Sequence, residues 1–282
     1  MRAHHSTYDS ARRGNVRRLG WHAVLLASVA VMIFPLLWAL LASFKPANEI
    51  YGAGLLPSSA SLENYRVALL DFPIGHVLVN TLVMASGVTL VQLLVAVPAA
   101  HAFARFRLRH ERMATALLTG ALLMPPQAVI VPQFLMVSEL GWRDTYWGLI
   151  IPQLSGCALA VLLLREHVRA IPASLFEAAA VEGASEWSVL RFVTLPLLRP
   201  ALGAVAILVF IGTWNEYLWP MIVAPRPEHT TIQMGLQLFL NQEGANPGPL
   251  IAAAMLTTLP IVAVYLVASR RVIHAFLQAG LH

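Results

Sequence analysis

The chain of 282 residues has little charge and a single cysteine. Charged residues make up 12% of the sequence, whereas a soluble domain carries about 25%. The lone Cys157 excludes an internal disulfide, and no ligand cluster surrounds it, so no metal site is expected. Hydrophobic residues make up 58% of the chain. This composition excludes a soluble enzyme, a disordered protein and a disulfide scaffold, and it predicts a multi-pass membrane protein.

Six stretches of the sequence are long and apolar enough to cross a membrane, which takes about 20 helical residues. Each is expected to be a helix, because lipid offers no other way to satisfy the backbone of a single span. Pro125, Pro126 and Pro132 break the third stretch, which cannot be a straight helix there. The sequence therefore predicts an all-α membrane protein with six spans, at about 22–44, 77–104, 113–137, 145–164, 201–223 and 250–269.

The basic residues predict the orientation of these spans. If the N-terminus is cytoplasmic, all but four of the 19 basic residues fall in inner segments, as the positive-inside rule requires. We therefore expect a cytoplasmic tail at 1–18, a membrane domain at 19–272 and a short cytoplasmic tail at 273–282. The alternative of a cleaved signal peptide is disfavoured, because the first apolar run exceeds the about 7–15 residues of a signal core. Nucleic-acid binding is not needed to explain the basic balance.

The inner loop between the fourth and fifth spans, 165–199, is much longer than a connection between adjacent helices requires. Within it, Ser174 and Glu177 have the spacing of a capping box, which predicts a helix from about Leu175. Small and apolar residues follow along this predicted helix. On these residues alone, two interpretations are open: an interfacial element packed on its own bundle, or a docking element for another protein.

Three further residues shape the second half of this loop. Gly183 is placed to end the first helix in a left-handed turn. Ser185 can cap a second helix, and Pro196 marks the return to the membrane. The loop is therefore predicted to be a helix, a glycine turn and a second helix.

The loop resembles the EAA loop, which marks the membrane subunits of bacterial ABC importers. The fixed positions of that pattern are matched, at its spacing, by Glu177-Ala178-Ala179, Gly183 and Val193-Thr194-Leu195-Pro196. From about residue 20 to 280 the chain resembles the six-span, maltose-type permeases of the carbohydrate-uptake branch. Further matching residues are Ser43-Phe44-Lys45, Asn64-Tyr65, Asn80-Thr81, Ala102-Phe103-Ala104-Arg105, Ile171-Pro172 and Trp214-Asn215-Glu216.

This resemblance implies a type I ABC importer permease bundle that takes up a sugar or sugar-like solute. The loop would seat a coupling helix in a cleft of a cytoplasmic ATPase dimer. That dimer would bind ATP and Mg, so no cofactor is expected in this chain. A second homologous permease and an extracytoplasmic solute-binding protein would complete the transporter in a bacterial inner membrane. The residues assigned to ATPase coupling are Ser174, Glu177, Ala178, Ala179, Gly183, Leu195 and Pro196.

The residue types suit this role. Ala178 and Ala179 allow close approach, as small residues do at tight helix contacts. Gly183 would permit the turn that aims the helix at its cleft. Glu177 has two interpretations, a pair with a basic residue of the ATPase or a cap of its own helix.

The sequence lacks the motifs of an enzyme. A phosphate-binding P-loop needs a Gly-Lys pair, and the only lysine, Lys45, follows Phe44. No HExxH motif is present, and no serine-hydrolase motif lies in a span. We therefore expect no catalytic residues in this chain and ATP hydrolysis in a separate subunit.

Polar residues within the spans are the candidates for a solute path. Glu216, the only acidic residue in a span, should face the bundle interior, water or a partner. With its neighbours Trp214 and Asn215 it either lies near the path or fixes helix packing through hydrogen bonds. Asn80 is the fourth path candidate, and hydrogen bonding between helices is its alternative role. The polar residues of the second span are Asn80, Gln92 and His101.

Two alternatives concern function. The ending Ala279-Gly280-Leu281 looks closer to relatives that import glycerol 3-phosphate or less typical sugars. A self-sufficient secondary transporter would show inverted repeats and several carboxylates in its spans, but the chain has one such carboxylate and no repeat. The chain also lacks the Gly-rich extension of many maltose-type permeases, so direct contact between its C-terminal tail and the nucleotide sites is not expected.

Overall fold

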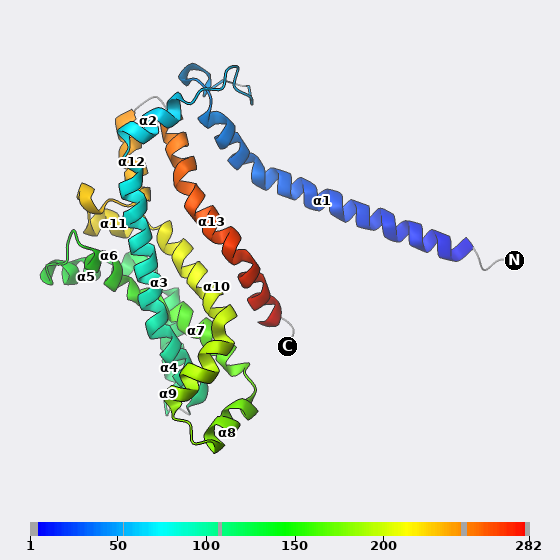
Figure 1. The fold of residues 1–282 in the computed structure, drawn as a ribbon, viewed down its shortest axis with the longest axis vertical. Coiled ribbons are helices and arrows are strands. Elements are labelled where there is room, and N and C mark those ends of the chain that lie inside the picture. The colour runs from blue at the N-terminus through cyan, green and yellow to red at the C-terminus, as the bar shows by residue number, and fades with distance from the viewer. Residues whose placement is uncertain (1–4, 53, 107–108, 244–246, 280–282) are drawn as a thin grey trace. The chain divides into compact units, whose positions relative to one another are not determined.

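The computed structural model describes residues 5–52, 54–106, 109–243 and 247–279, and Figure 1 shows the course of the chain. All regular elements in these ranges are helices, and no strand occurs among them. The chain forms two compact units, 1–71 with 242–256 and 72–241 with 257–282. The expectation of an all-α fold is therefore confirmed.

The first unit contains α1 (His5–Ser43), η1 (Ala47–Glu49), α2 (Glu63–Asp71) and the start of α13 (Pro247–Ala279). Hydrogen bonds organise the segment between α1 and α2. The Asn64 amide donates to the backbone oxygens of Ser43 and Lys45 at 3.0 and 2.8 Å. The ammonium group of Lys45, which is buried, donates to the Gly54 carbonyl. Polar contacts thus hold this irregular stretch in one conformation.

The carboxylate of Glu49 also stabilises this segment. It accepts hydrogen bonds from the side-chain hydroxyl and the backbone N–H of Ser58, and the latter bond is 3.0 Å long. These bonds favour the charged form and lower the pKa of Glu49 below its ordinary value. The stabilisation is therefore present at neutral pH and is lost as the pH falls through the lowered pKa.

The second unit contains the other helices. They are α3 (Ile74–Arg105), α4 (Glu111–Leu123), α5 (Pro126–Glu139), α6 (Tyr146–Ile150), η2 (Ile151–Gly156), α7 (Cys157–Arg169), α8 (Ala173–Val181), α9 (Glu186–Val189), η3 (Leu190–Thr194), α10 (Leu195–Trp214), α11 (Leu218–Val223), η4 (Pro227–His229) and α12 (Ile232–Glu243), whose last two residues belong to the first unit. The element η3 is a single π-helical turn.

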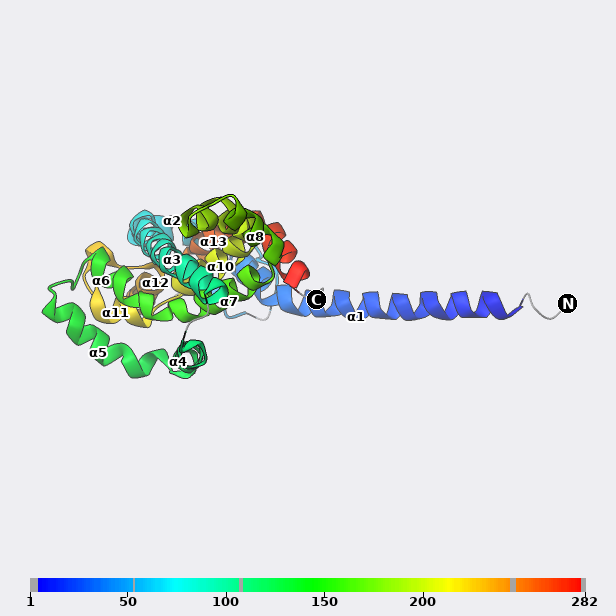
Figure 2. The ribbon, with the colours of Figure 1, turned by 90° about the horizontal axis from the view of Figure 1, so that it is seen from below.

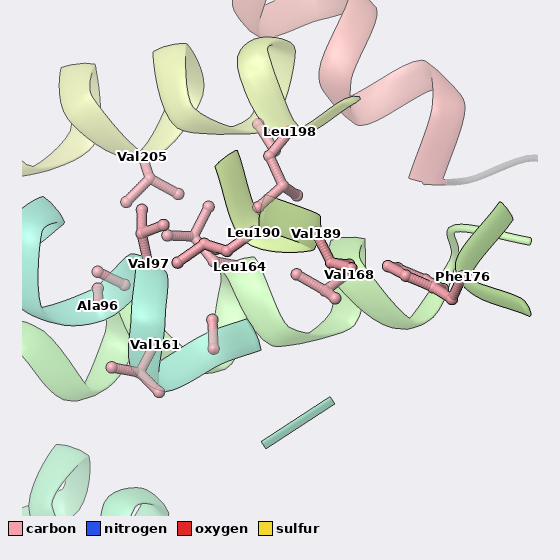
Figure 3. Packing of buried hydrophobic residues seen from close by; sticks show 13 residues of the cluster. Ala96, Val97, Val161, Leu164, Val168, Phe176, Val189, Leu190, Leu198 and Val205 are labelled. Carbon is pink, nitrogen blue, oxygen red and sulfur yellow. The ribbon is translucent and has the colours of Figure 1, made fainter. Parts of the chain in front are cut away.

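Helices α3, α7 and α10 pack together around one core cluster of 13 buried residues (Figure 3). Small residues on α3 and α7, including Ala96, Ala100 and Ala160, let the helix backbones approach closely. The same cluster includes residues of α8, α9 and η3. The members are Ala96, Val97, Ala100, Ala160, Val161, Leu164, Val168, Phe176, Val189, Leu190, Leu198, Ala201 and Val205.

Within the described ranges, five helical stretches are long and apolar enough to cross a membrane, or six if a bent helix pair counts as one span. The bent pair is α4 with α5, whose axes differ by 96°. The break lies at Pro125-Pro126, where the sequence predicted one, because a proline ring fixes φ and supplies no backbone donor. The other five stretches are 20–43, 74–105, 146–169, 186–214 and 247–266.

The fifth span departs from the prediction at both ends. The expected helix over 201–223 begins much earlier, because α9, η3 and α10 form one helical stretch from Glu186. It also stops at Trp214, and a separate helix, α11, begins at Leu218. The intervening residues include Glu216, so this carboxylate lies at a helix break and not inside a continuous span.

Gly148 in α6 offers a test of this packing. A Cβ atom at this position would lie 2.3 Å from the backbone oxygen of Trp142 and 3.1 Å from Val223 Cγ1. Backbone cannot move aside cheaply, so Gly148→Ala is expected to lower the free energy of unfolding by about 1–3 kcal/mol. Thermal unfolding of the detergent-solubilised protein measures this.

The matched control is Gly120→Ala in α4, where the new methyl group would meet no atom within 4 Å. Alanine is the better helix former, so this variant is expected to keep or raise the melting temperature. Equal melting temperatures for the two variants would contradict the packing around Gly148.

Candidate functional site

The loop 165–199 carries a left-handed turn at Gly183. The φ angle of Gly183 is +73°, a conformation that costs little only for glycine. The N–H of Gly183 donates to the Ala180 carbonyl at 3.1 Å, and the N–H of Ala184 donates to the Ala179 carbonyl at 3.0 Å. This pair of bonds ends α8 in a Schellman motif, as the sequence predicts.

The predicted capping box at the start of α8 is wrong. The helix begins at Ala173, so Ser174 lies within its first turn and is exposed. Pro172 occupies the cap position, and no side chain caps the helix. Proline has a fixed φ and no backbone N–H, so it can precede a helix without a side-chain cap. Helix α8 therefore starts at Ala173, two residues before the start that the capping box predicts. Glu177 is exposed and does not cap its own helix, which removes one of its two interpretations.

The second half of the loop is partly as predicted. The Ser185 hydroxyl caps α9 by accepting a hydrogen bond from the Ser188 N–H at 3.2 Å. Pro196, which the sequence places at the return to the membrane, lies within a helical stretch that continues into α10. The Leu195 N–H donates to the Leu190 carbonyl, and this π-turn widens the helix just before Pro196. The extra room lets a proline without a backbone donor continue into α10.

Phe176 joins α8 to the membrane helices. Its ring is 4% exposed and belongs to the core cluster, where it packs with Val168 of α7 and Val189 of α9 (Figure 3). The guanidinium carbon of Arg105, at the end of α3, lies 4.1 Å from the ring centroid. The loop and the helices α3, α7 and α10 therefore form one packed body.

Large apolar side chains lie exposed on the same loop. Val181 is 89% exposed and Trp187 is 68% exposed, while Leu175 and Phe192 are also exposed. Figures 1 and 2 show α8 at one end of the second unit, outside the helices α3, α7 and α10. Helix α8, which carries Leu175 and Val181, has nine residues and is too short to cross a membrane, so a place within a membrane span does not explain these two exposed side chains. Exposed apolar surface of this kind marks interaction sites.

A buried polar contact links the loop to α3. His101 of α3 is buried, and its Nδ1 lies 3.0 Å from the hydroxyl of Thr194 in the π-turn. Its Nε2 lies 3.4 Å from a carboxylate oxygen of Glu186 in α9. The sequence identified His101 as a polar residue that bonds between helices, but it gave no signal for either partner.

This contact supports a prediction about stability. His101→Leu leaves the buried Thr194 hydroxyl without its partner, so the free energy of unfolding is expected to fall by about 1–3 kcal/mol. In the double variant His101→Leu with Thr194→Val, both polar groups are gone, and the loss is expected to be smaller than the sum of the two single losses. Chemical denaturation of the four proteins measures this. Additive losses would show that the two side chains do not interact.

A cavity of about 210 Å³ lies among α3, α7 and α10. The Gln92 amide donates to the Gln153 backbone oxygen at 2.7 Å. One carboxylate oxygen of Glu216 accepts from the N–H groups of Leu218 and Trp219 at 3.1 and 3.3 Å. The cavity is lined by Gln92, Gln153, Gly156, Leu159, Ala160, Leu163, Val205, Leu208, Val209, Gly212, Thr213 and Glu216.

Of the four residues predicted for a solute path, only Glu216 lines this cavity. Trp214 is buried and packs on Phe210, with ring centroids 5.5 Å apart. Asn215 is exposed, and its amide donates to the Ile211 carbonyl at 2.8 Å. A path role for these two residues stays a prediction.

Asn80, the fourth candidate, fastens a loop to α3. Its amide donates to the backbone oxygens of Glu228 and Thr230, both at 3.0 Å, and its oxygen accepts from the Tyr146 hydroxyl at 2.6 Å. This geometry is the alternative role that the sequence offered for Asn80. A part in the path stays a prediction for this residue too.

Gln153 and Thr213, which also line the cavity, were not among the residues predicted for a solute path. Gln153 follows Pro152 in the fourth predicted span, and an uncharged polar residue at such a break was an available signal. Thr213 gave no signal, because threonine is common in helices that contact no solute. Among the described residues, no group of three or more His, Cys, Asp or Glu side chains is placed to hold a metal ion.

Comparison with known proteins gives consistent matches. A family model described as binding-protein-dependent transport system inner membrane component matches residues 92–273. The diacetylchitobiose uptake system permease protein NgcG of Streptomyces coelicolor is 30% identical, over 89% of this chain and 84% of its own. The sn-glycerol-3-phosphate transport system permease protein UgpE of Escherichia coli is also 30% identical, over 92% of this chain and 95% of its own.

A solved structure shares the fold. It is the crystal structure of a bacterial ABC transporter involved in the import of the acidic polysaccharide alginate. One of its chains superposes with a TM-score of 0.76 and 24% identity, and the match covers 92% of this chain and 97% of that one. At this identity the likeness shows the fold alone, which is the expected bundle.

Proposed function

Because the chain belongs to the family of inner-membrane components of binding-protein-dependent transport systems, we propose that it is the permease subunit of an ATP-driven importer for a sugar or sugar-like solute. Relatives at 30% identity, one named as an uptake system permease and one as a transport system permease, support this proposal. The helices α3, α7 and α10 would form part of the solute path, and ATP hydrolysis would take place in a separate subunit.

The proposed coupling between the loop and the membrane helices rests on the core cluster. It packs Phe176 of α8 against the same side chains that hold α3, α7 and α10 together. A force applied to α8 is therefore transmitted to these helices, since close-packed interiors do not deform continuously. We assign the exposed surface of α8 and α9, with Val181 and Trp187, to a cleft of an ATPase subunit. Closure of an ATPase dimer around ATP and Mg would then move the membrane helices.

Three further parts of the proposal concern orientation and partners. The distribution of basic residues supports cytoplasmic N- and C-termini and a cytoplasmic loop 165–199. The family's dependence on binding proteins supports an extracytoplasmic solute-binding protein. Since one bundle of five or six spans is small for a complete path, a second homologous permease would supply the other half.

Purification of the tagged chain from its native membrane tests the proposal. We expect an ATPase with Walker motifs and a second permease to copurify, and we expect proteoliposomes of the complex to take up solute only with ATP. Uptake by the chain alone, without ATP, would overturn the proposal in favour of a secondary transporter. The named relatives include a permease for glycerol 3-phosphate, so an anionic solute is the second candidate for the cargo.

A further inference from the structure

The cavity among α3, α7 and α10 presents side-chain oxygens that accept no hydrogen bond from the described residues. Gln92 and Gln153 each use the amide nitrogen for a hydrogen bond, to the backbone oxygens of Gln153 and Leu149 at 2.7 and 2.9 Å. A backbone carbonyl only accepts, so these bonds fix the orientation of both amides. Within the described residues, the two side-chain oxygens form no hydrogen bond. Each amide therefore offers a free acceptor.

Thr213 and Glu216 add two more oxygens. In the described helices the hydroxyls of Thr81, Thr89 and Thr119 each bond back to a carbonyl four residues earlier. Thr213 of α10 is buried and makes no such bond within the described residues, so its hydroxyl is free. Only one carboxylate oxygen of Glu216 is engaged, by the two backbone N–H groups of α11.

The charge of the cavity lining has one sign. Glu216 is its only ionisable side chain, and no Lys, Arg or His belongs to the lining. An anionic solute would meet the Glu216 carboxylate and no positive charge in the lining, although the Thr213 hydroxyl and the second N–H of each amide could donate to it. A solute rich in O–H or N–H groups would instead donate hydrogen bonds to the carboxylate and the amide oxygens.

The space suits a small solute. Its volume of about 210 Å³ is far more than the about 15 Å³ that one water molecule requires. A Cβ atom on Gly212 would meet no atom within 4 Å. Leu159, Leu163 and Leu208 supply apolar walls, against which the carbon face of a sugar ring can pack.

We propose that this cavity is a subsite for a single neutral or cationic sugar ring and that it disfavours anionic solutes such as phosphate esters and uronates. The inference rests on the proposed function, and it names the solute class of the same path. Gln92, Gln153, Thr213 and Glu216 are the side chains that favour neutral or cationic sugars over anionic ones.

Binding of three matched monosaccharides tests the proposal. The copurified complex is placed in lipid nanodiscs without a binding protein. N-acetylglucosamine, glucosamine as its cation and glucuronate as its anion are then compared by saturation-transfer NMR. We expect the neutral and cationic probes to bind, and glucuronate to bind at least about tenfold more weakly. Equal binding of glucuronate and N-acetylglucosamine would overturn the proposal.

Glu216→Gln is the sharpest variant, because the new side chain keeps the oxygen that accepts from α11 and loses only the charge. Glucosamine binding is expected to fall about tenfold and glucuronate binding to rise, with N-acetylglucosamine little changed. An unchanged order of preference in this variant would contradict the assigned role of the carboxylate.

Gly212→Phe locates the bound sugar, since its ring would fill the cavity. Binding of all three probes is expected to disappear, whereas Gly120→Phe, at another unhindered helical glycine, is expected to keep it. Persistent binding in Gly212→Phe would place the sugar elsewhere and overturn the proposal.

Copurification of the ATPase is measured on the same samples. If the ATPase copurifies but glucuronate binds as well as the other two sugars, the subsite is refuted and the proposed function is not. If the ATPase does not copurify, the proposed function is refuted as well.

Discussion

Gly183→Val is expected to abolish ATP-dependent uptake while the protein still inserts and folds. At a φ of +73°, a residue with a Cβ atom costs about 1–2 kcal/mol, and a β-branched residue costs more. A Cβ atom here would meet no atom within 4 Å, so the effect is purely conformational. The turn would relax, the bond from Ala184 to Ala179 would be lost, and α8 would point in a different direction. ATPase copurification and uptake by proteoliposomes measure the effect.

Two controls accompany this variant. Gly183→Asn is expected to keep most of the uptake, because asparagine tolerates the left-handed conformation. Gly120→Val introduces the same side chain at an exposed helical glycine, where φ is ordinary, and it is expected to have little effect. Loss of membrane insertion in Gly183→Val would show that the turn serves folding and would count against a docking role.

Phe176→Ala is expected to lower the stability of the protein and its association with the ATPase together. The ring is buried in the core cluster, and removing a buried phenylalanine costs about 3–5 kcal/mol. The loss also removes the partner of the Arg105 guanidinium. We expect α8 to detach from α7 and α9, so that ATP hydrolysis no longer drives uptake. Melting temperature, ATPase copurification and the ratio of solute imported to ATP hydrolysed are the three measurements.

Trp187→Ala separates stability from docking. This side chain is 68% exposed, so its removal is expected to leave the free energy of unfolding within about 0.5 kcal/mol. If the exposed surface docks on the ATPase, copurification should still weaken. A Trp187→Ala protein that keeps its full ATPase complement would remove this residue from the docking surface.

Sequence patterns predicted the parts of the fold that depend on local chemistry. The apolar runs identified the helices, the proline pair located the bend between α4 and α5, and Gly183 and Ser185 gave the turn and the cap. Each of these features follows from a few adjacent residues. The errors arose where a second local signal competed with the first, as Pro172 did with the capping residue Ser174.

The cavity was beyond the reach of the sequence, because it depends on tertiary contacts. Gln92, Gln153 and Glu216 are separated along the chain, and nothing in their spacing indicates that they surround one space. The break of the helix at Trp214 was equally hidden, since the stretch on either side of Glu216 is apolar. Only packing decided which of the polar residues line the cavity and which, like Asn80, fasten a loop.

Because the helical stretch continues through Pro196, it can act as a lever between the loop and the cavity. The helical stretch from Glu186 to Trp214 has 29 residues and is therefore about 44 Å long. A tilt of about 10° about its α9 end would displace the other end, next to Glu216, by roughly 8 Å. Small strokes in the loop thus become displacements as large as a sugar ring at the cavity. A helix that ended at Pro196 would have placed a flexible joint about a third of the way along this stretch, and a tilt of α9 would not have been transmitted to the far end.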